Sequence, residues 1–149
     1  MIIGGTIDAI LKHKTGDLWS ISPEMTVFEA ITIMADKNIG SLLVTANEKL
    51  VGIISERDYT RKVALRGKSS RETPVRDIIS TPVVVANPSH TVEECLRLMT
   101  ENRVRHLPVL DRDKIVGVVS IGDLVNWIIS AQDVAIKQME NYIAGNYYC

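Results

Sequence analysis

The sequence of 149 residues predicts an α+β fold in which two β-α-β-β-α repeats pack about a pseudo-twofold axis. Three observations predict this fold. One half of the chain matches the other without a gap, each half opens a helix with a capping box, and each such helix precedes two short apolar segments of strand length. Repeats of about 60 residues are small for independent folding, so we expect the two to share a core.

The internal repeat has an offset of 65 residues, which aligns Pro23 with Pro88 (88 − 23 = 65). Over residues 23–58 and 88–123, 12 of 36 positions are identical, and most of the others keep their apolar character. Because chance explains an ungapped match of this length poorly, the two segments should fold alike.

The first helix of each repeat is predicted by its cap and by the spacing of its apolar residues. The pairs Thr26/Glu29 and Thr91/Glu94 have the spacing of a capping box. The residues that follow have the spacing of one buried helical face; they are Val27, Ala30, Ile31 and Met34 in repeat one, and Val92, Cys95, Leu96 and Met99 in repeat two.

The strands of each repeat surround this helix in the sequence. Short β segments are expected at 19–22 and 83–86, before the helices. Two longer strands should follow each helix and form an antiparallel hairpin across a polar turn, at about 41–45 and 50–54, and at about 106–110 and 115–119. A second helix should begin near Glu56 and near Ile121.

The flanks are expected to be helical. Residues 6–14 place Ile7, Ile10 and Leu11 on one helical face. Residues 128–144 form a long helix whose apolar stripe could dock on its own domain or on a partner subunit; the stripe contains Ala135, Met139, Tyr142 and Ile143. The expected organisation is an N-terminal helical segment at 1–18, repeat one at 19–66, a linker at 67–81, repeat two at 82–130, and a C-terminal helix and tail at 131–149.

Composition and charge narrow the class of protein. Seventeen basic and 18 acidic residues give a formal charge of −1, so a generally basic surface for nucleic acid is not expected. No apolar run approaches the roughly 18 residues of a membrane span, and the N-terminus has no signal-peptide core. Two cysteines in a chain of this length make no disulfide framework, so we expect a cytoplasmic protein with reduced thiols.

Metal binding and catalysis are not expected. His13, His90 and His106 are far apart in the sequence, and no Cys-x-x-Cys spacing occurs. Cys95 lies on the predicted buried helical face, where a small thiol acts as an apolar side chain, and Cys149 is the last residue. The chain has no phosphate-binding loop and no Gly-x-Ser-x-Gly motif, so it is not expected to be an enzyme.

A basic segment allows an alternative interpretation. Residues 57–76 contain seven basic and two acidic residues, a local charge of 7 − 2 = +5. The segment could be a solvated face, attract the phosphates of a ligand, or hold an acidic protein or a nucleic acid. A protein- or nucleic-acid-interaction module is therefore the alternative function.

Both repeats end in the same motif, in which glycine, two aliphatic residues and Ser-x-x-Asp follow one another. Gly52 and Gly117 interrupt a strand, which often marks the close approach of a ligand or of another backbone. Ser55 and Ser120 stand where a strand ends and a helix begins, so backbone N–H groups there could face an anion.

The acid of this motif has two compatible interpretations. Asp58 and Asp123 could each accept hydrogen bonds from the two vicinal hydroxyls of a ribose. Ser-x-x-Asp is also a plausible helix cap, with serine at the N-cap and the acid three residues later.

These endings, together with the segment Arg105-His106-Leu107-Pro108-Val109, resemble the tandem cystathionine-β-synthase-type (CBS) domain pair, or Bateman module. The resemblance covers about residues 19–130, with both repeats in register. It implies a stand-alone sensor that binds an adenosine-containing ligand such as AMP, ATP, NAD or S-adenosylmethionine as a regulatory ligand. It also implies a homodimer whose output passes to an effector protein of unknown identity.

The resemblance and the motif together give three groups of candidate ligand contacts. The ribose contacts are Ser55, Asp58, Ser120 and Asp123. The phosphate contacts are Arg57, Arg105, His106 and Gly122. The adenine pocket is aliphatic, because aromatic residues are scarce, and it contains Ile21, Ile39, Gly40, Val104 and Ile121. Repeat one has Gly40 and Ser41 where repeat two has Arg105 and His106, so the two sites should differ in affinity.

Overall fold

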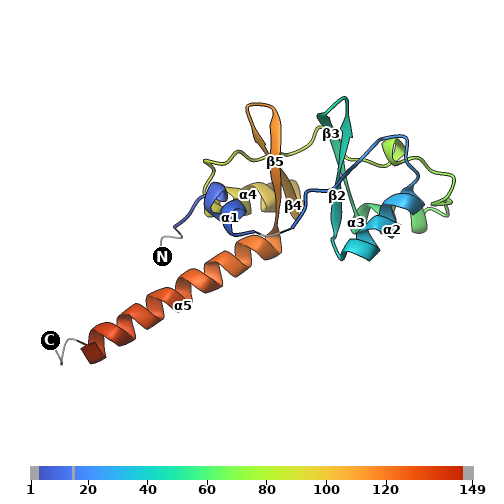
Figure 1. Ribbon diagram of the computed structural model, residues 1–149. Helices are drawn as coiled ribbons and strands as arrows, with labels where there is room; N and C mark the ends of the chain where they lie inside the picture. The colour runs from blue at the N-terminus through green and yellow to red at the C-terminus, as the bar shows by residue number, and fades with distance from the viewer. Residues whose placement is uncertain (1–3, 15, 146–149) are drawn as a thin grey trace. The chain divides into compact units, whose positions relative to one another are not determined.

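The computed structural model describes residues 4–14 and 16–145 and confirms the α+β class with two related repeats (Figure 1). The elements in chain order are α1 (Ile7–His13), β1 (Ser20–Ile21), α2 (Val27–Lys37), β2 (Ser41–Ala46), β3 (Lys49–Ser55), α3 (Glu56–Tyr59), the π-helix η1 (Thr60–Ala64), the 3-10 helix η2 (Val75–Asp77), α4 (Val92–Asn102), β4 (His106–Asp111), β5 (Lys114–Ser120) and α5 (Ile121–Gly145).

The chain divides into two compact units. The first unit contains the described residues of 1–15 together with 86–109 and 117–149, and the second contains 16–85 and 110–116. The N-terminal helix α1 therefore belongs to the unit that holds most of repeat two, whereas repeat one lies in the second unit.

Repeat one is built on a three-stranded sheet in the order β1-β2-β3. Strand β1 runs parallel to β2, and β2 pairs antiparallel with β3. The turn of this hairpin places Asn47 and Glu48 at φ values of 52° and 64°, as a tight hairpin turn with two left-handed residues requires. The predicted hairpin of repeat one is confirmed.

Repeat two has the corresponding hairpin of β4 and β5. Its turn residues Arg112 and Asp113 also have positive φ values, of 50° and 67°. The short strand expected at 83–86 is reduced to a single parallel bridge between Ala86 and Val109.

The predicted threonine caps start both first helices. Thr26 Oγ1 accepts a hydrogen bond from Glu29 N at 3.1 Å, and Thr91 Oγ1 accepts one from Glu94 N at 3.0 Å. In α4 the Glu94 carboxylate also accepts from Thr91 N at 3.1 Å, which completes the capping box. In α2 the Glu29 carboxylate accepts from the Thr26 hydroxyl instead, at 3.1 Å, so the capping box predicted for this helix is only half formed.

The faces predicted for these helices are buried. The fully buried members are Val27, Ala30 and Met34 in α2, and Val92, Cys95 and Met99 in α4. Burial, together with the negative charge of Glu94, raises the pKa of the Cys95 thiol to about 11. Cys95 is therefore an apolar core residue, as expected, whereas Cys149 lies outside the described residues.

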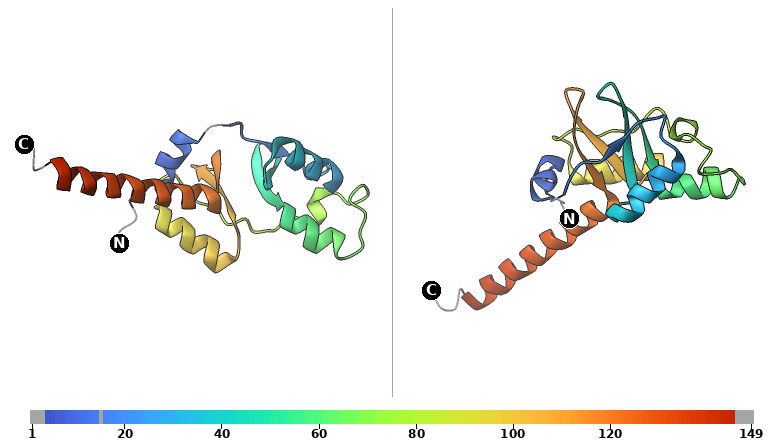
Figure 2. Two further views of the ribbon diagram at one scale, coloured as in Figure 1. Left: turned by 90° about the horizontal axis from the view of Figure 1, so that it is seen from below. Right: turned by 45° about the vertical axis from the view of Figure 1, so that its right-hand side comes forward.

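The second helices of the two repeats differ in length. In repeat one, α3 has four residues and continues into η1 before Gly67 and Pro74 interrupt the chain. In repeat two, α5 is a single helix of 25 residues that includes the separately predicted tail helix (Figure 2). No glycine or proline occurs between Gly122 and Gly145 to end it.

Among the described residues, no helix is long and apolar enough to cross a lipid bilayer.

Each repeat is covered by a segment that packs in an equivalent way. In the first unit, Thr6 forms a bridge with Thr91, and the segment continues into α1. In the second unit, Pro74 forms a bridge with Thr26, and the segment continues into η2. We call residues 6–14 and 74–80 the covering segments. The start of the chain thus completes repeat two, and the segment between the repeats completes repeat one.

Candidate functional site

The Ser-x-x-Asp motif of repeat one forms a tight capping turn at the start of α3. Asp58 N donates to Ser55 Oγ at 3.2 Å. The Asp58 Oδ2 atom accepts from Ser55 N at 2.9 Å and from the Ser55 hydroxyl at 3.0 Å. The capping interpretation of this motif is therefore confirmed, and the half-buried carboxylate is fixed at the first turn of the helix.

The same turn occurs at the start of α5. Asp123 N donates to Ser120 Oγ at 3.1 Å, and Asp123 Oδ2 accepts from Ser120 N at 2.8 Å. The Asp123 side chain keeps 24% of its surface exposed. The two repeats therefore place an equivalent acid in an equivalent position on the backbone.

A backbone hydrogen bond joins each turn to the residue that precedes the neighbouring strand. Glu56 N donates to Gly40 O at 3.1 Å, and Ile121 N donates to Arg105 O at 2.8 Å. These bonds bring candidate contacts that are distant in sequence together within each unit. One cluster contains Ile39, Gly40, Ser55, Arg57 and Asp58, and the other contains Val104, Arg105, His106, Ser120, Ile121, Gly122 and Asp123.

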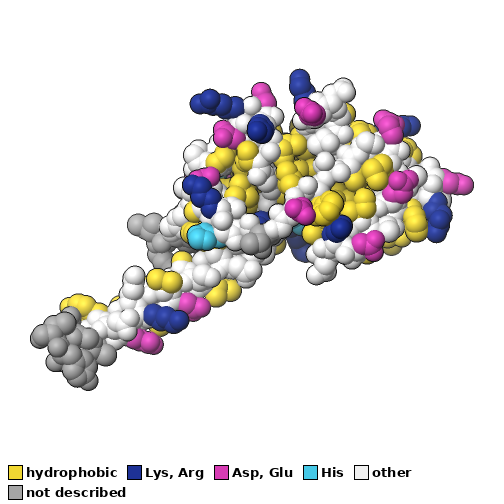
Figure 3. Space-filling model, viewed as in Figure 1, with side chains coloured by type: hydrophobic (Ala, Val, Ile, Leu, Met, Phe, Trp, Pro, Cys, Tyr) yellow, Lys and Arg dark blue, Asp and Glu magenta, His cyan; other side chains and the backbone are white. Residues whose placement is uncertain are grey.

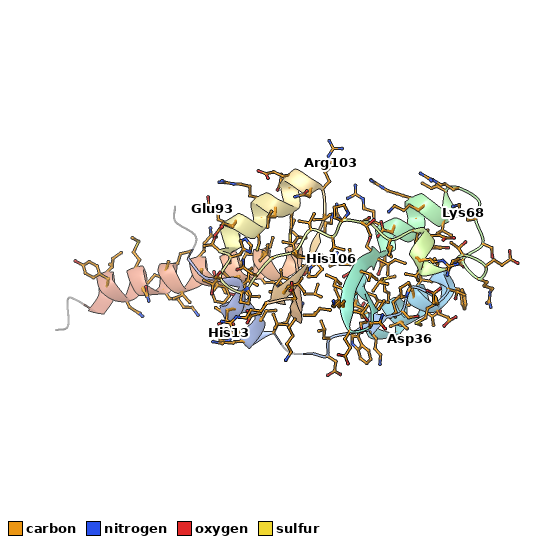
Figure 4. The ribbon with its side chains drawn as sticks, turned by 90° about the horizontal axis from the view of Figure 1, so that it is seen from above. His13, Asp36, Lys68, Glu93, Arg103 and His106 are labelled. Carbon is orange, nitrogen blue, oxygen red and sulfur yellow. The ribbon has the colours of Figure 1, made fainter. Side chains whose placement is uncertain are left out.

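The candidate contacts differ in how accessible they are. Arg57, Arg105 and Gly122 are exposed, and Ile121 is 41% exposed. His106 is half-buried at the start of β4 and already has an interaction partner (Figure 4).

The aliphatic candidates of repeat one lie closer to its core. Ile21 is 5% exposed and belongs to the hydrophobic core of the second unit, whereas Ile39 is half-buried and packs against that core. Val104 is half-buried in repeat two.

Two lysines that the sequence reasoning did not select contact the candidate acids. Lys62 Nζ lies 3.2 Å from Asp58 Oδ1, and Lys14 Nζ lies 2.9 Å from Asp123 Oδ2. Lys62 stands four residues after Asp58 on a helix, so the spacing could have indicated that pair. Lys14 is separated from Asp123 by 109 residues, and no local pattern could indicate it.

The charge of Asp123 is stabilised by these partners. Burial raises the pKa of its carboxyl group, but the bonds from the Lys14 ammonium and from Ser120 N–H outweigh that effect and lower the pKa below its ordinary value. At neutral pH the group is a carboxylate that can accept hydrogen bonds and cannot donate them.

The strand glycines make close approaches, but their neighbours are side chains. A Cβ atom at Gly52 would lie 2.7 Å from Ile79 Cδ1, and one at Gly117 would lie 2.6 Å from Leu11 Cδ2. Ile79 and Leu11 belong to the two covering segments. The interpretation of these glycines as places where a ligand or a second backbone approaches is therefore corrected.

The basic segment is partly neutralised by its own surroundings. Arg76 pairs with Glu24, Lys62 pairs with Asp58, and the guanidinium of Arg71 lies 3.9 Å from the centre of the Phe28 ring.

Within residues 4–14 and 16–145, no cluster of histidine, cysteine and acidic side chains could hold a metal ion.

Comparisons with known proteins identify the family. The CBS domain family matches residues 11–65 and 75–130. The chain is 36% identical to the mitochondrial CBS domain-containing protein CBSX3 of Arabidopsis thaliana, over 95% of this chain and 73% of that protein. It is 32% identical to the CBS domain-containing protein YhcV of Bacillus subtilis, over 94% of this chain and 92% of that one.

A solved structure agrees with this assignment. A protein with CBS domains from Burkholderia ambifaria superposes with a TM-score of 0.83 at 44% identity, covering 86% of this chain and 96% of that one. The two capping turns occupy the same position in each matched domain. The chain belongs to the CBS domain family and carries two CBS domains in tandem, which is the arrangement of a regulatory module.

Proposed function

We propose that this CBS pair is a sensor that binds an adenosine-containing nucleotide of the AMP, ATP or NAD class at one or both Ser-x-x-Asp turns. The observation that carries the proposal is the duplicated, partly exposed carboxylate at the first turn of α3 and of α5, held in place by a serine. Ligand occupancy would then shift the packing of repeats or subunits and so signal to a partner protein, without catalysis.

The chemistry assigns a role to each group of residues. Asp58 and Asp123 accept hydrogen bonds from the ribose hydroxyls, and Ser55 and Ser120 hold the acids in position. Arg105 and His106 contact phosphate in repeat two, and an exposed arginine fork suits that anion. Repeat one offers Arg57 instead, so the two sites should bind with different affinities.

A thermal-shift panel with AMP, ADP, ATP, NAD, NADH and S-adenosylmethionine tests this function. A ligand present at 100 times its Kd adds roughly 2.7 kcal/mol to the free energy of unfolding. For a chain of this size we expect Tm to rise by about 5–10 °C. Asp58→Asn and Asp123→Asn should each reduce the rise, measured against the same variant without ligand.

The matched control for these variants is Glu94→Gln. Glu94 is the acid of the α4 capping box and has no proposed contact with ligand, so this variant loses a capping carboxylate while keeping the rise in Tm. Absence of a shift with every compound would contradict the function. An equal loss of the ligand effect in Glu94→Gln would contradict the assignment of the acids.

We also propose that the chain forms a homodimer through α5. Apolar residues follow one another along this helix in alternating steps of four and three, which is the spacing of a helix–helix seam; they are Val125, Ile129, Ile136, Met139 and Ile143, with Gln132 between them. All five apolar side chains are at least 43% exposed, and hydrophobic atoms are visible along the helix in Figure 3. The exposure of these side chains supports docking on a partner subunit.

Light scattering during size-exclusion chromatography tests the dimer. We expect a dimer for the unmodified chain and a monomer for the double variant Ile136→Glu/Met139→Glu, because two buried carboxylates would destabilise the seam. Lys137→Glu, an exposed change between these positions but outside the seam, should leave the dimer intact. A monomeric unmodified chain, or a dimer that the double variant does not affect, would contradict the proposal.

We also propose that the protein is located in the cytoplasm.

A further inference from the structure

We propose that Lys14 and a bound ligand compete for the carboxylate of Asp123, so that occupancy of this site loosens the end of helix α1. This inference rests on the proposed function and specifies how the site of repeat two is regulated. It concerns contacts within the first unit only.

The lone pairs of the Asp123 carboxylate limit how many donors each oxygen can bind. Each carboxylate oxygen has two positions that accept hydrogen bonds. Asp123 Oδ2 fills both, one with Ser120 N at 2.8 Å and the other with Lys14 Nζ at 2.9 Å. Both of these hydrogen bonds are made to Oδ2, and neither uses Asp123 Oδ1. A ligand hydroxyl that binds Oδ1 competes with neither of these two donors, whereas one that binds Oδ2 competes with Lys14.

One of the two donors on Oδ2 must leave before a diol can bind both oxygens. A vicinal diol that binds both carboxylate oxygens needs a free position on Oδ2. Ser120 N–H is fixed by the capping turn that starts α5, so its loss would disrupt the helix start. Lys14 is a flexible side chain with 39% of its surface exposed, and its ammonium can move into water. Lys14 is the donor that a diol would displace.

Displacement of Lys14 affects the end of helix α1. Lys14 is the residue that ends α1, and its ammonium also donates to Val118 O on β5 at 2.7 Å. It thus ties the end of α1 both to the strand and to the acid of the site. The start of α1 is held separately by buried Ile7 and Ile10, so displacement of Lys14 frees the last turn while the helix stays docked.

Repeat one has a similar bridge, but its lysine comes from the helix of the site and not from the covering segment. Lys62 lies on the helix itself and binds Asp58 Oδ1, while its ammonium donates to Ile78 O at 3.0 Å and to Ser80 Oγ at 3.1 Å. In both repeats a lysine therefore joins the acid of the site to the covering segment. Only in repeat two does that lysine occupy the same carboxylate oxygen as the serine N–H.

Trp127 is a built-in reporter of this contact. Its indole N–H donates to Gly4 O at 2.9 Å, and its ring lies 6.2 Å from that of His13, which is labelled at the end of α1 in Figure 4. The second tryptophan of the chain, Trp19, lies in the other unit beneath Lys37. In a Trp19→Phe background the tryptophan emission therefore comes from the first unit alone.

The experiment compares AMP binding to the full-length chain and to Lys14→Met, both with Trp19→Phe, by calorimetry and by Trp127 fluorescence. Lys14→Met keeps an unbranched apolar side chain and removes the competing ammonium, so we expect AMP to bind about fivefold more tightly. Because Lys14→Met has no ammonium for AMP to displace, the change in Trp127 emission on AMP binding should be smaller in the variant. The control Lys12→Met removes the same charge from α1, where Lys12 pairs with Asp8.

The outcomes separate the inference from the function on which it rests. Tighter binding in Lys14→Met alone supports competition, because loss of a positive charge would otherwise weaken the binding of an anion, as expected for Lys12→Met. Binding of AMP with equal or lower affinity in Lys14→Met overturns the competition and leaves the sensor function standing. If neither protein binds AMP or any compound of the panel, both proposals fail.

Discussion

Leu124→Ala is expected to lower the free energy of unfolding by about 2–5 kcal/mol. Leu124 is completely buried in the first unit, directly after the acid of the candidate site. Truncation would remove apolar contact and leave a cavity beside the first turn of α5. The same loss should reduce Tm by roughly 4–20 °C, since each kcal/mol corresponds to about 2–4 °C in a chain of this size.

The control for this substitution is an exposed valine on the same helix, outside the proposed dimer seam. Val134 is 54% exposed, so Val134→Ala should change the free energy of unfolding by no more than about 0.5 kcal/mol. Urea denaturation of the unmodified chain and of the two variants measures both effects. Equal stability of Leu124→Ala and Val134→Ala would mean that the start of α5 is not anchored by the core, and the geometry of the candidate site would need another cause.

The second large effect is expected at a strand glycine. Gly52→Ala places a Cβ atom 2.7 Å from Ile79 Cδ1 and 3.0 Å from Ile79 Cβ, which is closer than real side chains approach. Because the Cβ atom of Ile79 is tied to the backbone, the covering segment must shift. We expect a loss of about 1–3 kcal/mol in the free energy of unfolding, as for overpacked cores.

Two further variants identify the cause of this loss. Gly122→Ala lies in the first turn of α5, where the new methyl group would meet only Ser120 Oγ at 3.5 Å, so stability should rise by about 0.5–1 kcal/mol. Ile79→Ala should interact favourably with Gly52→Ala, because the shorter side chain leaves room for the methyl group. If the two changes are simply additive, steric conflict with Ile79 is not the origin of the loss.

Local patterns predicted the elements of the fold well. The repeat, the threonine caps and the alternation of apolar residues depend on neighbours within a few positions, so residues such as Thr91 and Glu94 were sufficient to predict α4 and its cap. The continuity of α5 was not predicted. A helix beginning near Ile121 and a separate helix at 128–144 were expected, whereas the structure has one helix. The strand expected at 83–86 is reduced to a single bridge at Ala86, and the local alternation of apolar residues did not indicate this.

The candidate site was predicted only in part. The motif indicated the two turns, and the structure confirms their capping geometry, while their ligand contacts remain a proposal. The partners of these turns come from distant segments: Lys14 reaches Asp123 across the length of the chain, and Ile79 fills the space beside Gly52. No periodicity within a repeat carries information about a contact made by a covering segment.

The exchange of covering segments has a consequence for synthesis on the ribosome. Ile7 and Ile10 leave the ribosome before repeat one, yet they belong to the unit whose α4 and α5 are made after repeat one. At roughly 5–20 residues per second, α1 waits on the order of ten seconds before its partners are available. Repeat one is completed by a segment translated directly after it and can finish folding during that interval. Helix α1 is therefore made before repeat one but can dock only after repeat one has been made.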